Sequence, residues 1–198
     1  MSCNEYKLVI LGRGAVGKTS IVTRFICGYF PETYDPTIGG DDYRRQISVD
    51  GQICMLDILD YCGEMDEFSA IREQYMRAAQ GYVIVYSIAD LDSFESISYY
   101  YDQIIHTKGT RNVPIILIGN KCDLEEEKRQ VAREQGEELA RQLNCPFFET
   151  SAKENICIDD TFPEVVREIN ARLPPEPEPE PVEESKKRSK FLKFFKRK

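Results

Sequence analysis

The sequence lacks several features that would direct it to a membrane, an export route or a metal. No run of apolar residues approaches the length of a transmembrane helix. The start, Met-Ser-Cys-Asn, has neither the apolar region of a signal peptide nor a glycine for myristoylation. Seven cysteines show no C-x-x-C pair or metal-ligand spacing, which indicates reduced thiols. The single histidine, His106, falls late in an expected helix and is interpreted as a surface residue. We therefore expect a cytosolic or peripheral protein.

The charge is unevenly distributed along the 198 residues. Residues 174–198 contain five acidic and eight basic residues, whereas the preceding residues contain 29 acidic and 18 basic ones. An acidic globular part argues against nucleic acid as its ligand. With 41% hydrophobic residues, the chain suits one compact domain plus an appendage.

Strand and helix patterns alternate along the chain. Asp50-Gly51 is a strong hairpin signal between two strands within residues 43–59. Asp92 is a candidate cap for the helix before the fifth strand, and Pro163 is expected in the first turn of the last helix. Strands are expected at 6–11, within 43–59, and at 82–88, 115–119 and 146–149; helices are expected at 16–27, 92–107, 131–143 and around 162–173.

This alternation predicts the α/β class. The sheet should have six strands, mostly parallel with one antiparallel strand, and helices on both faces. Strands at 82–88 and 115–119 are almost wholly apolar, as expected of strands buried on both sides. Ligands of such sheets bind at the carboxyl ends of the strands.

The segment GRGAVGKT, residues 12–19, lies between the first strand and the first helix. Its glycines allow the backbone N–H groups to point at anionic oxygens, helped by the positive end of the helix. Lys18 can reach the β- and γ-phosphates, and the Thr19 hydroxyl suits Mg²⁺. The alternative is a glycine-rich turn without a ligand. The loop predicts a nucleotide without saying which.

Further polar residues follow the other strands. Asp60 ends an apolar strand, as a carboxylate serving Mg²⁺ should, and Gly63 lets a backbone N–H approach the γ-phosphate. Thr37 lies in a polar loop. The Asp123 carboxylate can accept from both N–H edges of guanine, whereas adenine offers an acceptor at N1. The sequence therefore favours a guanine nucleotide.

The order of these motifs, with the segments YDPTI, LDILD, GNKCDL and ETSAK, resembles the Ras branch of the small GTPases over residues 4 to about 172. The resemblance implies the P-loop small GTPase fold, GTP/GDP and Mg²⁺ as ligands, and a GTP-hydrolysing switch. It implies a monomer that works with an exchange factor, a GTPase-activating protein, and effectors that bind the switch regions. A P-loop kinase lacks support, because no lid or acceptor-site signature accompanies the guanine motifs.

The resemblance also assigns roles to residues. Thr19 and Thr37 would ligate Mg²⁺, and Asp60 would hold a water on it. Phe30 and Lys121 would sandwich the guanine, although Phe30 could instead anchor a loop and Thr37 could be a turn residue. The catalytic candidates are Lys18, Thr37, Gly63 and Glu64. The nucleotide-binding candidates are Gly14, Ala15, Val16, Gly17, Lys18, Thr19, Ser20, Phe30, Thr37, Gly63, Asn120, Lys121, Asp123, Ser151, Ala152 and Lys153.

Two departures from the family pattern bear on function. Gly39-Gly40-Asp41-Asp42 makes the effector segment one residue longer, which departs from Ras-type effector recognition. Glu64 stands where the family usually has a water-orienting glutamine. An ionised carboxylate repels the γ-phosphate, so intrinsic turnover should be slow. The alternative is a slowly or non-hydrolysing GTP-bound adaptor at a membrane that recruits partners.

The composition changes at the end of the chain and predicts three parts: a GTP-binding domain at 1–173, a Pro/Glu linker at 174–184 and a basic amphipathic tail at 185–198. The last cysteine is Cys157, so the usual prenylation box of Ras-like chains is missing. Four apolar residues lie among eight Lys/Arg, an arrangement similar to the Rit type: Phe191, Leu192, Phe194 and Phe195. The tail predicts peripheral binding at the anionic cytoplasmic face of the plasma membrane. A nuclear-localisation run is the alternative.

Overall fold

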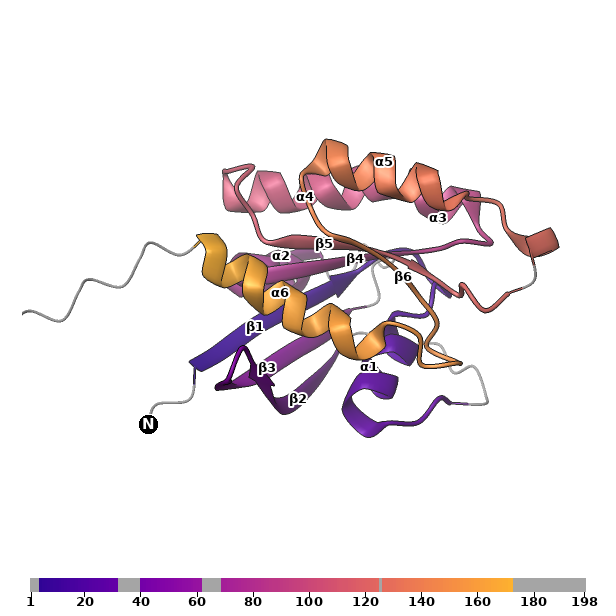
Figure 1. Ribbon diagram of the computed structural model, residues 1–198. Helices are drawn as coiled ribbons and strands as arrows, with labels where there is room; N and C mark the ends of the chain where they lie inside the picture. The colour runs from indigo at the N-terminus through magenta and orange to yellow at the C-terminus, as the bar shows by residue number, and fades with distance from the viewer. Residues whose placement is uncertain (1–3, 32–39, 62–68, 125, 173–198) are drawn as a thin grey trace, which may run out of the picture.

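The computed structural model describes residues 4–31, 40–61, 69–124 and 126–172. Its centre is a six-stranded sheet in the order β2-β3-β1-β4-β5-β6 (Figure 1). β2 pairs antiparallel with β3, and every other pairing is parallel, which confirms the expected fold class. The strands are β1 Asn4–Leu11, β2 Gly40–Val49, β3 Gln52–Tyr61, β4 Gly81–Ser87, β5 Ile115–Asn120 and β6 Phe147–Thr150.

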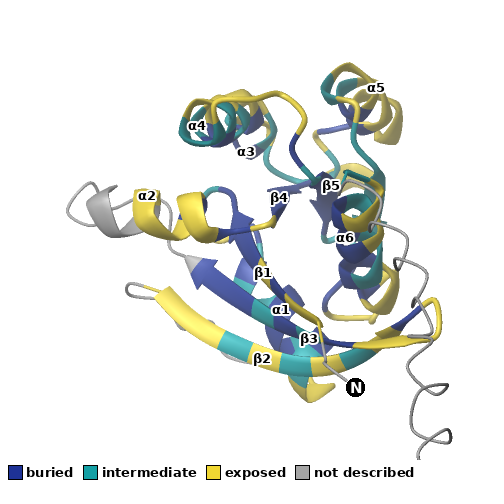
Figure 2. Ribbon diagram, turned by 90° about the vertical axis from the view of Figure 1, so that its left-hand side faces the viewer, coloured by how far each residue is buried: buried dark blue, intermediate teal, exposed yellow. Residues whose placement is uncertain are grey.

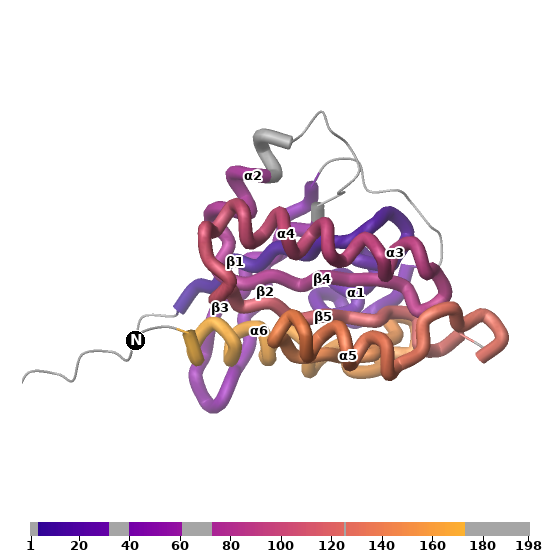
Figure 3. Tube along the Cα trace, turned by 90° about the horizontal axis from the view of Figure 1, so that it is seen from above, coloured from indigo at the N-terminus to yellow at the C-terminus, as the bar shows by residue number. Residues whose placement is uncertain are grey.

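Helices cover both faces of the sheet. α1 and α6 pack on one face; α2, α4 and α5 pack on the other, where α3, α4 and α5 lie toward the viewer in Figure 3. β4 and β5 are buried along their whole length, whereas β2 at the sheet edge carries many exposed residues (Figure 2). The helices are α1 Lys18–Cys27, α2 Ser69–Ala78, α3 Leu91–Glu95, α4 Ile97–Lys108, α5 Arg133–Leu143 and α6 Ile158–Arg172, with a short 3₁₀ turn, η2, at Glu126–Lys128.

The hairpin turn has the backbone that its sequence predicts. Asp50 and Gly51 both have positive φ, 49° and 82°. This conformation matches the twist of the two flanking strands and suits a residue pair of this type. The turn therefore fixes the pairing of β2 with β3 over their full length, from Gly40 opposite Tyr61 to Val49 opposite Gln52.

Two details of the helices differ from the sequence-based expectations. Asp90, not Asp92, caps α3, and its carboxylate accepts from the Ser93 N–H at 3.2 Å. The helix begins early because the Ser93 hydroxyl also accepts from the Ser87 N–H at the end of β4. The expected single helix is broken at Ser96 into α3 and α4.

Pro163 is the sixth residue of α6, so its expected place in the first turn was wrong. The helix begins at Ile158 with Asp159 and Asp160 in its first turn, where acidic residues favour a helix start. It continues past the proline because several apolar side chains of α6 are buried against the sheet. α2 was not predicted at all. No helix among the described residues is long and apolar enough to cross a membrane.

The register of the parallel strands brings their carboxyl ends together. Ile10 lies opposite Asp60, Ser87 opposite Asn120, and Asn120 opposite Thr150. This end of the sheet is the one toward which β1 runs, away from the N-terminus (Figure 1). The fold therefore gathers the carboxyl ends of β1, β3, β5 and β6 at one edge of the sheet.

Candidate functional site

The loop between β1 and α1 has a backbone that requires its glycines. Gly12 has φ 147°, and a Cβ there would lie 2.2 Å from the carbonyl oxygen of Val85. Gly17 has φ 98° and directly precedes α1. The N-terminus of α1 therefore has no side-chain cap. Ala15 also has positive φ, 60°. Positive φ at these three positions lets the loop curl in front of the positive end of α1.

Lys18, the first residue of α1, is buried and folds back over the loop. Its Nζ donates to the carbonyl oxygens of Gly12 and Arg13, each at 2.8 Å. Lysine is rarely buried unless its charge is satisfied. The loop thus holds an ammonium group at its centre, where it can serve an anionic ligand.

The segment after β5 is bonded to this loop. Asn120 Nδ2 donates to the Val16 carbonyl at 2.9 Å, and Lys121 Nζ donates to the Ala15 carbonyl at 2.7 Å. Lys121 has φ 70°, a costly conformation for a residue with a side chain. Burial lowers the pKa of Lys121, opposed by the carboxylates of Asp90 and Asp123. Two residues predicted to bind the base therefore also hold the phosphate loop.

The segment after β6 meets the segment after β5. Ser151 Oγ donates to Asp123 Oδ1 at 2.6 Å and accepts from the Glu154 N–H at 3.0 Å. Thr150 Oγ1 donates to Asn120 Oδ1 at 3.1 Å, a contact that sequence reasoning did not assign although ETSAK was recognised as a motif. Ala152 is buried beside them, whereas Lys153 is exposed. The predicted base-reading residues are thus brought together.

Asp60, at the end of β3, is fully buried beside the start of α1. Its Oδ2 accepts from Thr19 Oγ1 at 2.5 Å, and its Oδ1 has no hydrogen-bond partner among the described residues. Burial raises the pKa of Asp60, opposed by the Thr19 hydrogen bond and the Lys18 charge. A carboxylate and a hydroxyl side by side are hard oxygen donors, so the pair fits Mg²⁺.

The remaining site predictions divide between described and undescribed parts of the chain. Phe30 is half-buried and packs against the core beneath α1 and α6, as the loop-anchor alternative requires; its stacking on a base remains a prediction. Gly14 and Ser20 are half-buried on either side of the loop tip. Thr37, Gly63 and Glu64 lie outside the described residues.

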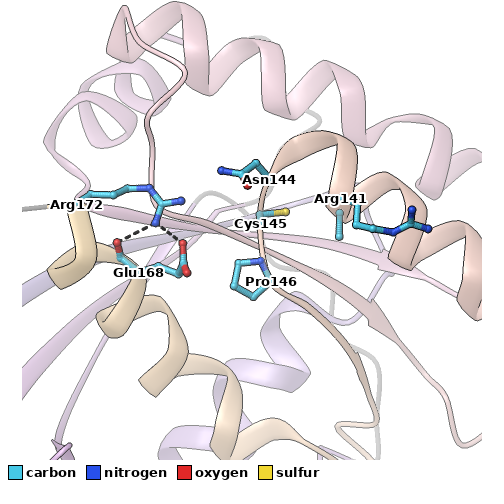
Figure 4. A pocket seen from close by; sticks show the side chains of 7 residues that line it. Arg141, Asn144, Cys145, Pro146, Glu168 and Arg172 are labelled. Atoms are coloured by element: carbon cyan, nitrogen blue, oxygen red, sulfur yellow. Dashed lines mark hydrogen bonds and ion pairs between the residues drawn. The ribbon is translucent and has the colours of Figure 1, made fainter.

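A pocket of about 400 Å³ lies elsewhere, where α5 and α6 end and β6 begins (Figure 4). Arg172 and Glu168 form an ion pair on its wall. Burial raises the pKa of the Cys145 thiol to about 12, so the thiol stays protonated near neutral pH. The pocket contains none of the predicted nucleotide residues and lies at the opposite end of β6 from Ser151. Its lining residues are Ala140, Arg141, Asn144, Cys145, Pro146, Glu168 and Arg172.

The fold and this arrangement of loops define a P-loop nucleotide-binding protein. Comparison with known proteins agrees: a model of the Ras family matches residues 7–171. Ras-like protein rasB of Dictyostelium discoideum is 51% identical over 170 residues, which cover 86% of this chain and 85% of that protein. The chain therefore belongs to the Ras family and is a small GTPase. Members of this family generally bind guanine nucleotides and hydrolyse GTP.

Proposed function

We propose that the chain is a signalling switch that alternates between GTP-bound and GDP-bound states and hydrolyses GTP to GDP and phosphate. The observation that carries this proposal is the set of bonds from Asn120 and Lys121 to the phosphate loop. These bonds join base-reading and phosphate-binding segments into one site. The direct test is to denature the purified protein and identify the released nucleotide. We expect about one equivalent of GDP or GTP; a protein that neither retains nor takes up guanine nucleotide would contradict the proposal.

At the phosphate end, the backbone N–H groups from Gly14 to Lys18 bind phosphate oxygens. The Lys18 ammonium, already aligned by two carbonyls, adds a charge at the β- and γ-phosphates. Such preorganised donors stabilise charge that spreads over the γ-phosphate during attack by water. Lys18, Thr37 and Gly63 are therefore proposed to act in hydrolysis.

Mg²⁺ would be held by Thr19, Thr37 and Asp60, with Asp60 acting through a water. When bound there, the ion would supply positive charge that offsets the charge of the phosphates. The protein contributes a buried carboxylate oxygen without a described hydrogen-bond partner and a hydroxyl 2.5 Å from the other oxygen. These two groups select a hard cation at this position.

At the base end, Asp123 accepts from the two N–H groups of guanine, and its carboxylate is held by the Ser151 hydroxyl. Ala152 and Asn120 complete the recognition of the base edge. The aliphatic part of Lys121 lies along the phosphate loop because its Nζ reaches the Ala15 carbonyl, and it would form one face of the base slot with Phe30 opposite.

Replacing Glu64 by glutamine should raise the intrinsic rate of GTP hydrolysis by at least about tenfold. An amide can donate to the γ-phosphate while it accepts from water, whereas an ionised carboxylate repels the phosphate. Single-turnover hydrolysis of preloaded GTP measures this rate. Glu134→Gln, at an exposed position of α5, is the matched control and should leave the rate unchanged. Identical rates in the parent and Glu64→Gln would remove Glu64 from catalysis.

The same measurement separates the switch from its alternative. A GTP-bound adaptor that recruits partners would show hydrolysis no faster than the spontaneous reaction. The switch predicts measurable turnover that an activating protein accelerates, and Gly14 leaves room for an arginine from such a partner. An exchange factor would promote release of GDP, and effectors would bind the switch regions.

The tail at 185–198 should bind anionic membranes through two separable contributions. Raising the salt concentration should weaken adsorption to acidic vesicles by screening its eight basic residues. Replacing the four apolar tail residues by alanine should weaken adsorption at every salt concentration, because these side chains are then no longer buried in the membrane surface. The four residues are Phe191, Leu192, Phe194 and Phe195. Vesicle sedimentation measures both effects. We propose on this basis a peripheral location at the cytoplasmic face of the plasma membrane.

A chain shortened to end at Leu173 provides the control for the tail. It should remain in the supernatant with acidic vesicles, and both chains should remain there with neutral vesicles. Equal adsorption of the full and shortened chains to acidic vesicles would contradict the membrane role and favour a nuclear-localisation run.

A further inference from the structure

Arg24, in the last turn of α1, donates to three backbone carbonyls, one just past the end of its own helix and two in the distant loop after β6. Its Nε donates to the Ala152 oxygen at 2.8 Å and its Nη2 to the Lys153 oxygen at 2.7 Å. Its Nη1 donates to the Gly28 oxygen at 2.9 Å, and the Gly28 N–H donates back to the Arg24 carbonyl. The guanidinium thus ties the end of α1 to the loop after β6.

The bond to Lys153 reaches the base-reading carboxylate through one peptide group. The Lys153 carbonyl and the Glu154 N–H share a planar unit, so fixing one fixes the direction of the other. That N–H donates to Ser151 Oγ at 3.0 Å. The Ser151 hydroxyl in turn donates to Asp123 Oδ1 at 2.6 Å. A continuous chain of contacts therefore runs from Arg24 to Asp123.

The helix that carries Arg24 is itself firmly held. The Phe25 ring stacks on Phe162 of α6, with centroids 4.2 Å apart. Arg45 of β2 also lies over the Phe25 ring, 4.4 Å from its centroid, and donates to the Phe25 carbonyl. Because these contacts hold α1 in place, the Arg24 guanidinium has a defined position. Its hydrogen bonds then hold the loop after β6 in a defined position as well.

The three carbonyls around residue 24 require the donor geometry of an arginine side chain. A guanidinium presents several N–H donors in a fixed planar fork, which suits three carbonyls that lie in different directions. A lysine ammonium keeps the charge, which is favourable near the end of a helix, but it is a compact donor on a flexible stem. Substitution by lysine therefore removes the geometry and keeps the charge.

We propose that Arg24 is a positioning residue that sets the selectivity for guanine and the residence time of the nucleotide, acting through Ser151 and Asp123. This inference rests on the guanine-nucleotide function proposed above. Arg24 holds the loop so that the Asp123 carboxylate faces both N–H groups of guanine. When the loop is released, the carboxylate loses its alignment and the base is held less tightly.

Dissociation of labelled GDP and IDP from the full chain tests the proposal. In Arg24→Lys, GDP should dissociate about tenfold faster, and IDP only about threefold faster. The difference arises because hypoxanthine, the base of IDP, has no 2-amino group to donate to Asp123. Misalignment of the Asp123 carboxylate therefore removes one hydrogen bond fewer from IDP than from GDP. The ratio of the IDP rate to the GDP rate should therefore fall about threefold. An unchanged ratio would overturn the proposal, since a merely structural role would affect both nucleotides equally.

Two further variants make the result specific. Arg167→Lys is the matched control, because Arg167 also makes several hydrogen bonds, to Asp50 and Glu164. Asp50 lies in the turn before β3, whereas the candidate site lies where β3 ends. Arg167→Lys should leave both rates unchanged. Ser151→Ala removes the next link, so the ratio should fall similarly, and adding Arg24→Lys should lower it little further. Full additivity would overturn the proposal. A parent chain that retains no GDP would instead overturn the proposed function.

Discussion

Replacing Asp123 by asparagine should lower the affinity for GDP by at least about a hundredfold and admit xanthine nucleotides. One hydrogen bond from guanine to an ionised carboxylate, worth about 1.5–3 kcal/mol, is replaced by a contact between two donors, and the other becomes a weaker bond to a neutral amide oxygen. The Ser151 hydroxyl donates to Oδ1 of Asp123, and it can still donate to the amide oxygen of asparagine. The amide nitrogen then faces the base, where guanine also donates, whereas xanthine offers a carbonyl at C2. Equilibrium binding of GDP and XDP measures the exchange of preference.

Asp102→Asn is the matched control for this prediction. Asp102 is exposed on α4, so the same change of charge there should leave GDP and XDP affinities as in the parent. If Asp123→Asn binds GDP as tightly as the parent, the assignment of the base-reading residue fails, and with it the proposed guanine preference.

Replacing Gly12 by alanine should accelerate GDP release by about a hundredfold and destabilise the fold by about 2–4 kcal/mol. A Cβ at this position would lie 2.2 Å from the Val85 carbonyl oxygen, and φ of 147° is unfavourable for alanine. The backbone must therefore move, and the Gly12 carbonyl that aligns Lys18 moves with it. GDP release and thermal unfolding measure the two effects.

Gly109→Ala separates steric overlap from backbone strain. Gly109 has φ 67° at the end of α4, and nothing lies within 4 Å of an added Cβ. Strain alone should cost about 1 kcal/mol of unfolding free energy and leave GDP release unchanged. Equal release rates in the parent and Gly12→Ala would show that the phosphate loop tolerates movement and that its described geometry does not control binding.

The parts of the site that the sequence predicted are those encoded locally. Each motif follows an apolar run, so the end of a strand and its polar residue could be located together, as with the run at 115–119 and Asn120. Alternating elements then implied parallel strands whose carboxyl ends meet. The hairpin was predicted for the same reason, because Asp50-Gly51 specifies its turn by itself.

The parts that the sequence did not predict depend on contacts between distant residues. Asp90 and Asp92 are both acceptable caps by local rules, and the contact of Ser93 with Ser87 decides between them. The position of Pro163 within α6 is tolerated because of packing, which a local rule does not include. Arg24 is 128 residues from Ala152, and no spacing in the chain indicates that the two meet.

The bonds of Asn120 and Lys121 to the Val16 and Ala15 carbonyls use protein atoms only. The backbone of both loops is therefore ordered as the protein folds, and this loss of conformational entropy does not recur when a ligand arrives. We therefore expect more of the interaction energy with a nucleotide to remain as affinity, and the release of the nucleotide to be slow. A partner that opens the site need not compete for the base or the phosphates directly. Separating these two loops would raise the entropic cost of holding any nucleotide between them.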